Sequence, residues 1–232
     1  MSVSRWFLDA LNALIVRVVC SVDGEEMARV PLYGPLILIS NHVNMLEVLV
    51  LRSKLRPRHV FTFAKIESWD KPLLGWIFDT WNAIPIHRGG PDLVALRRGL
   101  DVLRDDGILG VMPEGTRSRN GKLQQGHSGV TTLALKSSAP ILPIVFYGGE
   151  NVVANMRRLR RTRFSIVVGE PLCVDVGDER PTRELRRRVT DEIMCEMASL
   201  LPPEYRGVYS AAPENRTRTH LRPCSGRATP RA

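Results

Sequence analysis

Cysteine is scarce in this chain, and the spacing of the few that occur excludes most metal and redox chemistry. The four residues are Cys20, Cys173, Cys195 and Cys224, and they form neither a C-x-x-C pair nor a Cys/His box. We therefore predict no metal site. The wide spacing also favours isolated thiols, as expected for a protein in a reducing compartment.

The first 20 residues lack the length and the uniform apolarity of a membrane-spanning segment. Three charged residues interrupt them, no small-residue cleavage site of secretory type follows, and a bilayer requires about 20 apolar residues. Their apolar positions recur near helical spacing, so residues 1–24 are predicted to form an amphipathic helix. This helix either lies in the membrane interface, with Trp6 and Phe7 at the boundary, or packs on the protein's own core.

Acidic residues are fewer than basic ones, with 24 Asp and Glu against 33 Lys and Arg and a net charge of +9. Such an excess fits a nucleic acid, an anionic membrane or a phosphorylated substrate. The densest run, residues 157–163, holds five arginines without interleaved aromatic residues. A nucleic-acid site is therefore not predicted, and a loop that faces solvent, a membrane or a phosphate is favoured.

Length and composition predict one folded domain. A chain of 232 residues, 44% of them hydrophobic and 25% charged, is able to form a single sizeable core. We assign this domain to residues 25–206, because no linker divides them. Residues 207–232 carry five arginines and one glutamate, are rich in Pro, Ala, Thr and Ser, and are predicted to be disordered.

Short apolar runs alternate with helical stretches along the domain. This alternation favours a single α/β domain with a mainly parallel or mixed central sheet flanked by helices. The predicted strands are 36–40, 60–64, 83–86, 108–112, 141–147 and 164–168. The predicted helices are 45–55, 72–80, 92–105, 129–137 and 182–201.

The first group of chemically active residues follows directly on the predicted strand 36–40. It consists of Ser40-Asn41-His42-Val43-Asn44-Met45-Leu46-Glu47. Because α/β proteins build their sites where strands end, His42 is expected at the edge of the sheet. A carboxylate five residues later is able to fold back onto the imidazole, fix its tautomer and stabilise the imidazolium. His42 and Glu47 are therefore a candidate general base and its partner.

The second group, Met112-Pro113-Glu114-Gly115-Thr116-Arg117-Ser118, also follows a predicted strand. Gly115 permits a tight turn, and the three residues after it offer donors of the kind that phosphate oxygens accept. A plain polar turn is the alternative.

Other polar residues are given ordinary roles. The stretch Gly126-His127-Ser128-Gly129 does not complete the G-x-S-x-G pattern of a hydrolase, and Ser128 fits the start of a helix better. His59 and His87 are interpreted as ordinary polar residues.

In order and spacing, these groups resemble the blocks of the glycerophospholipid acyltransferases, the family that includes 1-acylglycerol-3-phosphate acyltransferases. The family's N-H-x-x-x-x-D block is similar to Asn41 through Glu47, and its F-P-E-G-T-R-S block is similar to Met112 through Ser118. The family's apolar strand ending in arginine is similar to Ile84-Pro85-Ile86-His87-Arg88, and its proline-centred apolar stretch is similar to Ala139-Pro140-Ile141-Leu142-Pro143-Ile144-Val145. Two shorter segments, the family's A-K-x-E and P-x-x-G, are similar to Ala64-Lys65-Ile66-Glu67 and Pro72-Leu73-Leu74-Gly75-Trp76. The resemblance covers about residues 30–200.

The resemblance implies direct transfer of a fatty acyl group from a thioester to the free hydroxyl of 1-acylglycerol-3-phosphate, which gives phosphatidic acid. His42 would act as the base with Glu47 as its partner, and no covalent acyl-enzyme would form. The arginines would hold the glycerol phosphate, and Pro143 would shape a substrate pocket. The implied substrate-binding residues are Asn41, Lys65, Arg88, Glu114, Gly115, Thr116, Arg117, Ser118 and Pro143.

No cofactor is implied, because the donor, acyl-CoA or acyl carrier protein, is itself a substrate. The expected partners are the lysophospholipid, the acyl thioester and an anionic membrane surface, with acyl carrier protein as a partner if it is the donor. No nucleic acid is expected. The expected location is the cytoplasmic face of the membrane, in a peripheral or monotopic position.

Two positions depart from the family's pattern. Glu47 stands where the family has aspartate, and Gln124-Gln125-Gly126 stands where it usually has a lysine close to a glycine. Both departures leave open an acyltransferase for another lysolipid or polar acceptor. The first also leaves open a relative that binds lipid without catalysis.

Overall fold

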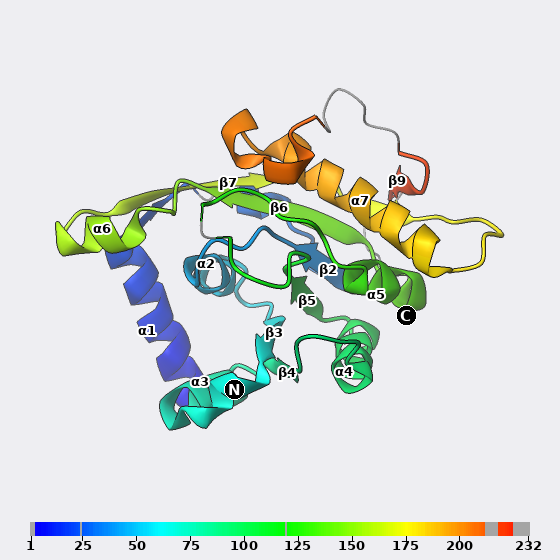
Figure 1. Cartoon of the computed structure of the whole chain (residues 1–232). Coiled ribbons are helices and arrows are strands. Elements are labelled where there is room, and N and C mark those ends of the chain that lie inside the picture. Colours follow the sequence, from blue (N-terminus) through cyan, green and yellow to red (C-terminus); the bar gives the residue numbers. More distant parts are fainter. Residues whose placement is uncertain (1–2, 24, 119, 212–217, 225–232) are drawn as a thin grey trace.

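The branched apolar runs form the strands of one mixed sheet (Figure 1). The computed structural model describes residues 3–23, 25–118, 120–211 and 218–224. The strands are β1 (Cys20–Val22), β2 (Leu36–Ile39), β3 (Val60–Lys65), β4 (Ile84–Ile86), β5 (Ile108–Val111), β6 (Ile141–Tyr147), β7 (Thr162–Val168), β8 (Leu172–Val174) and β9 (Leu221–Pro223). Their order is β1-β7-β6-β2-β5-β3-β4, and β8 pairs with both β6 and β9.

The central five strands, β6, β2, β5, β3 and β4, are parallel to one another. β7 and β8 run antiparallel to β6, and β1 runs parallel to β7. Since the central strands share one direction, their carboxyl ends meet at a single edge of the sheet. This edge is where parallel α/β sheets carry their sites.

Helices cover both faces of the sheet. They are α1 (Val3–Val19), α2 (Leu46–Lys54), α3 (Pro72–Thr80), α4 (Leu93–Arg104), α5 (Gly129–Ser137), α6 (Val152–Arg157) and α7 (Arg183–Leu200), with 3₁₀ turns η1 (Glu25–Arg29), η2 (Ile66–Asp70), η3 (Pro203–Tyr205) and η4 (Gly207–Tyr209). Successive side chains of β2 point to opposite faces. Ile37 and Ile39 pack with α4, α5 and α7, while Leu36 and Leu38 pack with α1 and α2.

The predicted fold class is confirmed: the chain is an α/β domain with a mixed central sheet flanked by helices and preceded by an N-terminal helix. The six predicted strands and five predicted helices all occur, with ends that differ by at most two residues. The sequence analysis missed β1, β8, β9 and α6. The three strands have only three residues each, too few to show an alternating pattern.

The C-terminal segment corrects two predictions. Cys173 and Cys224 form a disulfide, so they are not isolated thiols, whereas Cys20 and Cys195 take no part in a disulfide. Residues 218–224 are ordered, because β9 pairs with β8 and brings the two cysteines together. The prediction of disorder is therefore wrong for residues 207–211 and 218–224, and the rest of the tail, 212–217 and 225–232, lies outside the described residues.

His220 anchors this segment between two carboxylates. Its Nδ1 lies 2.7 Å from Glu192 Oε1 and its Nε2 lies 3.1 Å from Glu179 Oε1, and its side chain is buried. Burial by itself would lower the pKa of His220, but the hydrogen bonds to the two glutamates outweigh it, and the pKa is raised. The same hydrogen bond lowers the pKa of Glu179, which therefore stays ionised in mildly acidic solution.

We expect this histidine to stabilise the fold most in mildly acidic solution. A raised pKa in the folded state contributes stability that is fully present below the unfolded value and is lost as the pH rises through the folded value. The difference in Tm between the parent and His220→Gln, measured across pH, should thus be largest below about 6.5 and shrink at higher pH. A difference that does not change with pH would contradict the assignment.

The N-terminal helix α1 packs against α2 with its polar side. Asn12 Nδ2 donates to the carbonyl oxygen of Leu49, and Asp9 Oδ1 lies 3.7 Å from Arg52 NH2. Burial lowers the pKa of Arg52 to about 10, and the charge of Asp9 opposes this shift. Leu8 and Val16 of the helix are buried as well. The other large apolar side chains are exposed, and they are Val3, Trp6, Phe7, Leu11, Leu14, Ile15 and Val18. Neither α1 nor any other helix in the described ranges has the length and apolarity needed to cross a bilayer.

Candidate active site

The carboxyl edge of the parallel strands gathers the predicted polar residues. His42 follows β2, the segment Glu114–Ser118 follows β5, Lys65 ends β3 and Arg88 follows β4. Because β2 lies next to β5, His42 and the second group are direct neighbours, although 72 positions separate His42 from Glu114 in the sequence. The structure thus brings the two groups together as the strand positions predict.

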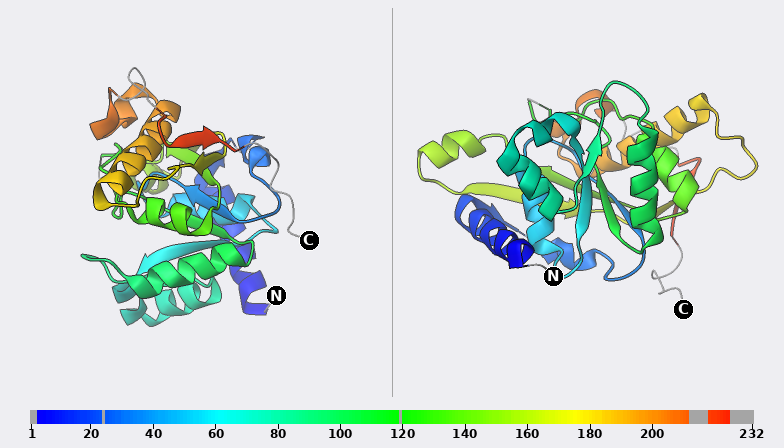
Figure 2. Two further views of the ribbon diagram at one scale, coloured as in Figure 1. Left: turned by 90° about the vertical axis from the view of Figure 1, so that its right-hand side faces the viewer. Right: turned by 90° about the horizontal axis from the view of Figure 1, so that it is seen from below.

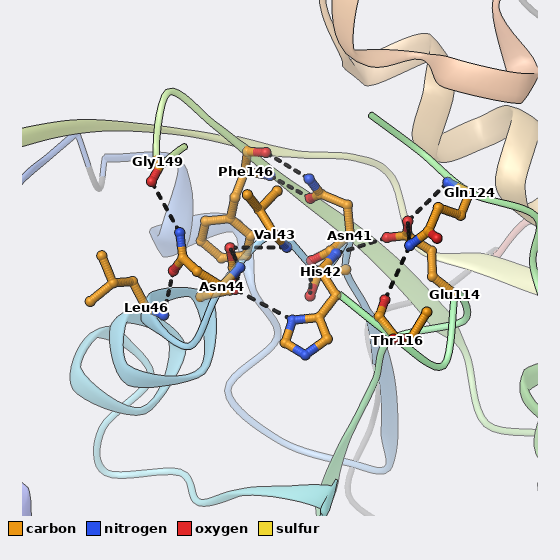
Figure 3. Close-up of polar contacts among 12 residues, drawn as sticks. Asn41, His42, Val43, Asn44, Leu46, Glu114, Thr116, Gln124, Phe146 and Gly149 are labelled. Carbon is orange, nitrogen blue, oxygen red and sulfur yellow. Dashed lines mark hydrogen bonds and ion pairs between the residues drawn. The ribbon is translucent and has the colours of Figure 1, made fainter. Parts of the chain in front are cut away.

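His42 and Glu47 face one another (Figure 3). His42 Nδ1 lies 3.5 Å from Glu47 Oε2, a distance longer than a good hydrogen bond. Nδ1 is buried and makes no hydrogen bond to any described residue. The Glu47 side chain is fully buried and accepts from the backbone amides of Val43 and Asn44. The longer side chain of glutamate therefore still reaches the imidazole, and it also holds the turn that carries the histidine.

Asn41 and Asn44 fix this turn to β6. Asn41 Nδ2 donates to the carbonyl oxygen of Phe146 at 2.7 Å, and its Oδ1 accepts from the amide of Phe146 at 2.8 Å. Asn44 Nδ2 donates to the carbonyl oxygen of Gly149, and its Oδ1 accepts from the amide of Leu46 at the start of α2. Since Asn41 is buried and its side-chain amide is hydrogen-bonded to the backbone of β6, it positions His42 from behind. Asn44 is a positioning residue that the sequence analysis did not single out.

Glu114 joins the two groups. Its Oε1 accepts from the amide of His42 at 2.8 Å, and its Oε2 accepts from the amide of Gln124 at 2.9 Å (Figure 3). Burial raises the pKa of the Glu114 carboxyl, and the hydrogen bonds from Gln124 and His42 oppose that shift. Glu114 and Gln124 therefore position the loop after β5 beside His42. The part played by Gln124 is visible only from its hydrogen bond to Glu114, ten positions away in the sequence.

The turn after β5 has the tight form that Gly115 was expected to permit. Gly115 has φ +67°, and its amide donates to the carbonyl oxygen of Met112. A Cβ at this position would lie 2.9 Å from Cδ2 of His127, so a larger residue would push that ring away. His127 thus lies beside the turn, a neighbour that sequence spacing did not indicate.

The other predicted residues of this turn differ in exposure. Ser118 is buried, its amide donates to the carbonyl oxygen of His42, and its hydroxyl bonds Asn120 Oδ1. Ser118 therefore fastens the loop and has little surface to offer a phosphate. Thr116 and Arg117 are exposed, and their contact with a phosphate stays a prediction.

Lys65 and Arg88 line the same edge at increasing distance from His42, and both are exposed. Arg88 follows β4, three strands from β2, so its backbone lies about 14 Å from that of His42 at about 4.8 Å per strand. Pro143 lies inside β6, buried and in register with Ile39. Because it is buried, it is able to shape a pocket only from behind.

A second histidine–carboxylate pair, His87 and Asp92, has the same spacing as the first, although His87 keeps its interpretation as an ordinary polar residue. His87 Nδ1 lies 3.1 Å from Asp92 Oδ2, and Asp92 also accepts from the amides of Val94 and Ala95 at the start of α4. Hydrogen bonds from the backbone amides of Ala95 and His87 lower the pKa of Asp92 to about 2. The His87 side chain is 76% exposed, whereas that of His42 is 12% exposed. The pair at His42 is therefore the one enclosed by neighbouring loops, and Asp92 mainly caps a helix.

The fold and the site together define an α/β protein with a histidine that faces a buried carboxylate at the centre of a cation-lined sheet edge. Residues 20–147 match the family described as Acyltransferase. This match covers more than half of the 232 residues, and the chain belongs to the acyltransferase family.

Curated relatives carry the name 1-acyl-sn-glycerol-3-phosphate acyltransferase. The protein from Pseudomonas aeruginosa is 26% identical over 198 residues, which cover 83% of this chain and 76% of that protein. The Bacillus subtilis protein is 22% identical over 187 residues, 78% of this chain and 90% of that protein. A chloroplastic relative from Brassica napus is 29% identical over 116 residues, 49% of this chain, and the match spans only 33% of that longer protein.

A solved structure has the same fold. The crystal structure of the 1-acyl-sn-glycerophosphate acyltransferase PlsC from Thermotoga maritima matches with a TM-score of 0.59 and 19% identity. The match covers 93% of this chain and 82% of that chain.

Proposed function

We propose that this protein transfers a fatty acyl group from a thioester to the free hydroxyl of 1-acylglycerol-3-phosphate. The observation that carries the proposal is the placement of His42, which is held by both neighbouring loops and faces Glu47. The cationic residues Lys65, Arg88 and Arg117 along the same edge suit an acceptor that bears a phosphate. The names of the relatives support the same acceptor.

The proposed chemistry is a single transfer. With Nδ1 facing Glu47, the other ring nitrogen of His42 points away from the carboxylate and accepts the proton of the acceptor hydroxyl. The oxygen attacks the thioester carbonyl, the C–S bond breaks, and the thiolate leaves and takes the proton from the imidazolium. Glu47 stabilises the imidazolium in between. The products are one ester and one free thiol, and no acyl-enzyme is required.

Acceptor-dependent release of thiol tests this proposal. Purified protein is mixed with acyl-CoA or acylated acyl carrier protein and a panel of lysolipids that differ in headgroup. We expect release only when an acceptor is present, and fastest release with 1-acylglycerol-3-phosphate. Faster transfer to an uncharged lysolipid would favour another acceptor, and no release with any acceptor would favour a lipid-binding relative. The long Nδ1–Oε2 distance of 3.5 Å is the observation that keeps this second candidate in view.

Alanine in place of Arg117 or Arg88 is expected to weaken binding of the acceptor but not of the acyl thioester. Loss of a charge-assisted contact to phosphate typically costs about 1.5–3 kcal/mol, which raises the KM for the acceptor by about 10- to 100-fold. The KM for the acyl thioester should stay near the parent value. Arg187→Ala, on the exposed face of α7, is the matched control. Unchanged acceptor kinetics in both variants would contradict the assignment.

We also propose that α1 binds the protein to the surface of an anionic membrane. Asp9 and Asn12 face α2, and the helix still leaves most of its large apolar side chains exposed in a stripe, although Leu8 and Val16 are buried. Helices of this kind lie in the interface with the apolar face among the acyl chains. The alternative that the helix only packs on the core leaves its exposed stripe without a purpose.

The double substitution Trp6→Ser and Phe7→Ser should lower binding to vesicles that contain phosphatidylglycerol. Each aromatic side chain contributes on the order of 1 kcal/mol or more when buried, so sedimentation with vesicles should fall by at least about tenfold. These positions leave Asp9 and Asn12 in place, so the fold is retained. The control is Val94→Ser on α4. Equal sedimentation of the variant and the parent would assign α1 to a purely structural role.

The cytoplasmic face of the membrane stays the proposed location. The Cys173–Cys224 disulfide is unusual for a reducing compartment. Labelling of thiols at the moment of cell lysis tests the location, because the cytoplasm should keep this pair reduced. A pair that is already oxidised in the cell would contradict it.

A further inference from the structure

Helix α6 lies in the connection between β6 and β7, and it forms an exposed apolar tip together with Leu159, which follows it. The apolar side chains of Val153, Met156 and Leu159 are all exposed, and that of Leu159 is 96% exposed. Val153 and Met156, three positions apart, lie on one side of the helix, and Leu159 follows directly after its C-cap residue Arg158. The sequence analysis noted the arginines that follow but not this apolar group.

Leu159 has a backbone conformation in which leucine is rare. Its φ is +52°, and the helix ends with the amide of Leu159 donating to Met156 and the amide of Arg160 donating to Asn155. This is the Schellman ending, whose left-handed position glycine usually occupies. A branched apolar residue is unfavourable there both for the backbone and for its contact with water. Neither cost is offset within the described structure, which points to a contact outside the protein.

Arginines surround the tip. Arg157, Arg158, Arg160, Arg161 and Arg163 are all exposed. Three of them, Arg158, Arg161 and Arg163, line a hollow of about 780 Å³ together with the side chains of Asn151, Asn155 and Ser165. Guanidinium and amide groups around an open hollow suit the phosphate of a lipid headgroup.

The tip lies at the active-site end of the sheet and next to α1. Asn44 Nδ2, in the turn that carries His42, donates to the carbonyl oxygen of Gly149 just before α6. Arg161 donates to the carbonyl oxygen of Cys20, directly after α1. Figures 1 and 2 show α6 beyond the C-terminal end of α1, so the two helices are neighbours at this end of the molecule.

We propose that α6 and the arginines after it form a second membrane-docking element, whose partner is an anionic bilayer. Val153, Met156 and Leu159 enter the boundary of the acyl chains, and the arginines bind lipid phosphates beside them. One apolar anchor binds a membrane only weakly, whereas an anchor combined with a basic patch binds stably. Two contacts, at α1 and at α6, also fix the orientation of the protein, with the edge that carries His42 turned to the bilayer. This orientation rests on the proposed use of a lipid acceptor.

The test compares variants in sedimentation with vesicles of phosphatidylcholine, with and without phosphatidylglycerol. Leu159→Asn suits the left-handed conformation better than leucine, so it should keep or raise the Tm while lowering binding about tenfold. Arg160→Glu should lower binding about fivefold or more, and only on vesicles that contain phosphatidylglycerol. Matched controls are Val94→Asn on α4 and Arg187→Glu on α7, both exposed and far from α6 (Figure 1).

A second readout separates this inference from the proposed function. Without vesicles, acyl transfer between short-chain, water-soluble substrates should be the same in Leu159→Asn, Arg160→Glu and the parent. If both variants bind vesicles as the parent does, the docking element is refuted, whatever the activity. If Arg160→Glu instead raises the KM for the acyl thioester without changing vesicle binding, the arginines serve the donor, and the inference is also refuted. A parent without transfer activity would refute only the proposed function.

Discussion

Replacement of His42 by alanine is expected to lower turnover by at least about 100-fold, the usual contribution of a general base. The fold should persist, because His42 is held by its backbone: its amide donates to Glu114 and its carbonyl oxygen accepts from Ser118. Alanine keeps both hydrogen bonds. The imidazole itself makes no hydrogen bond to the described residues through Nδ1, so little stability is lost with it. Turnover and Tm of the purified variant are the measurements.

The chain supplies a matched control in its second histidine–carboxylate pair. His87→Ala removes an imidazole that also faces a carboxylate five residues later, but one that is mostly exposed. Turnover should remain within about threefold of the parent, as is usual for a surface substitution outside a site. Near-normal turnover in His42→Ala would refute the mechanism. A large loss in His87→Ala alone would move the base to the other pair.

Glu47→Gln is expected to have the second largest effect, a fall in turnover of about 100-fold. The substitution keeps the size of the side chain but removes the charge that stabilises the imidazolium. In the parent, the amides of Val43 and Asn44 donate to the two carboxylate oxygens of Glu47, whereas glutamine offers them only one oxygen. Single-turnover rates with saturating acceptor separate this loss from any change in binding. Full activity in Glu47→Gln would show that Glu47 is not the partner.

Aspartate at the same position distinguishes an enzyme from a lipid-binding relative. The shorter side chain of Glu47→Asp restores the family's usual residue, and the variant should keep measurable transfer. It draws the carboxylate back by about one bond, so the turn at Val43 has to follow it. If the parent is inactive and Glu47→Asp transfers the acyl group, the natural protein has lost catalysis. Binding of lipid would then be the better function for this chain.

Local patterns in the sequence determined much of this protein. Apolar runs followed by helical periodicity predicted the central strands and five helices, because both patterns arise from neighbours a few residues apart. The ends of these strands also predicted where His42 and the segment from Glu114 to Ser118 lie, since parallel strands carry their sites at one edge. Arg88 and Arg117 are exposed, and their role as phosphate ligands stays a prediction that only kinetic measurements test.

Tertiary contacts decided what these patterns leave open. Glu114 was expected among the substrate-binding residues, but it holds the backbone of His42, because adjacent strands bring residues 72 positions apart together. Strand β9 lies in a segment whose polar composition predicted disorder, but its pairing with β8 and the disulfide order it. The sequence also did not decide exposure, because the same helical period fits a buried or an exposed stripe. Only the packing of α1 on α2 left most of its large apolar side chains exposed, while it buried Leu8 and Val16.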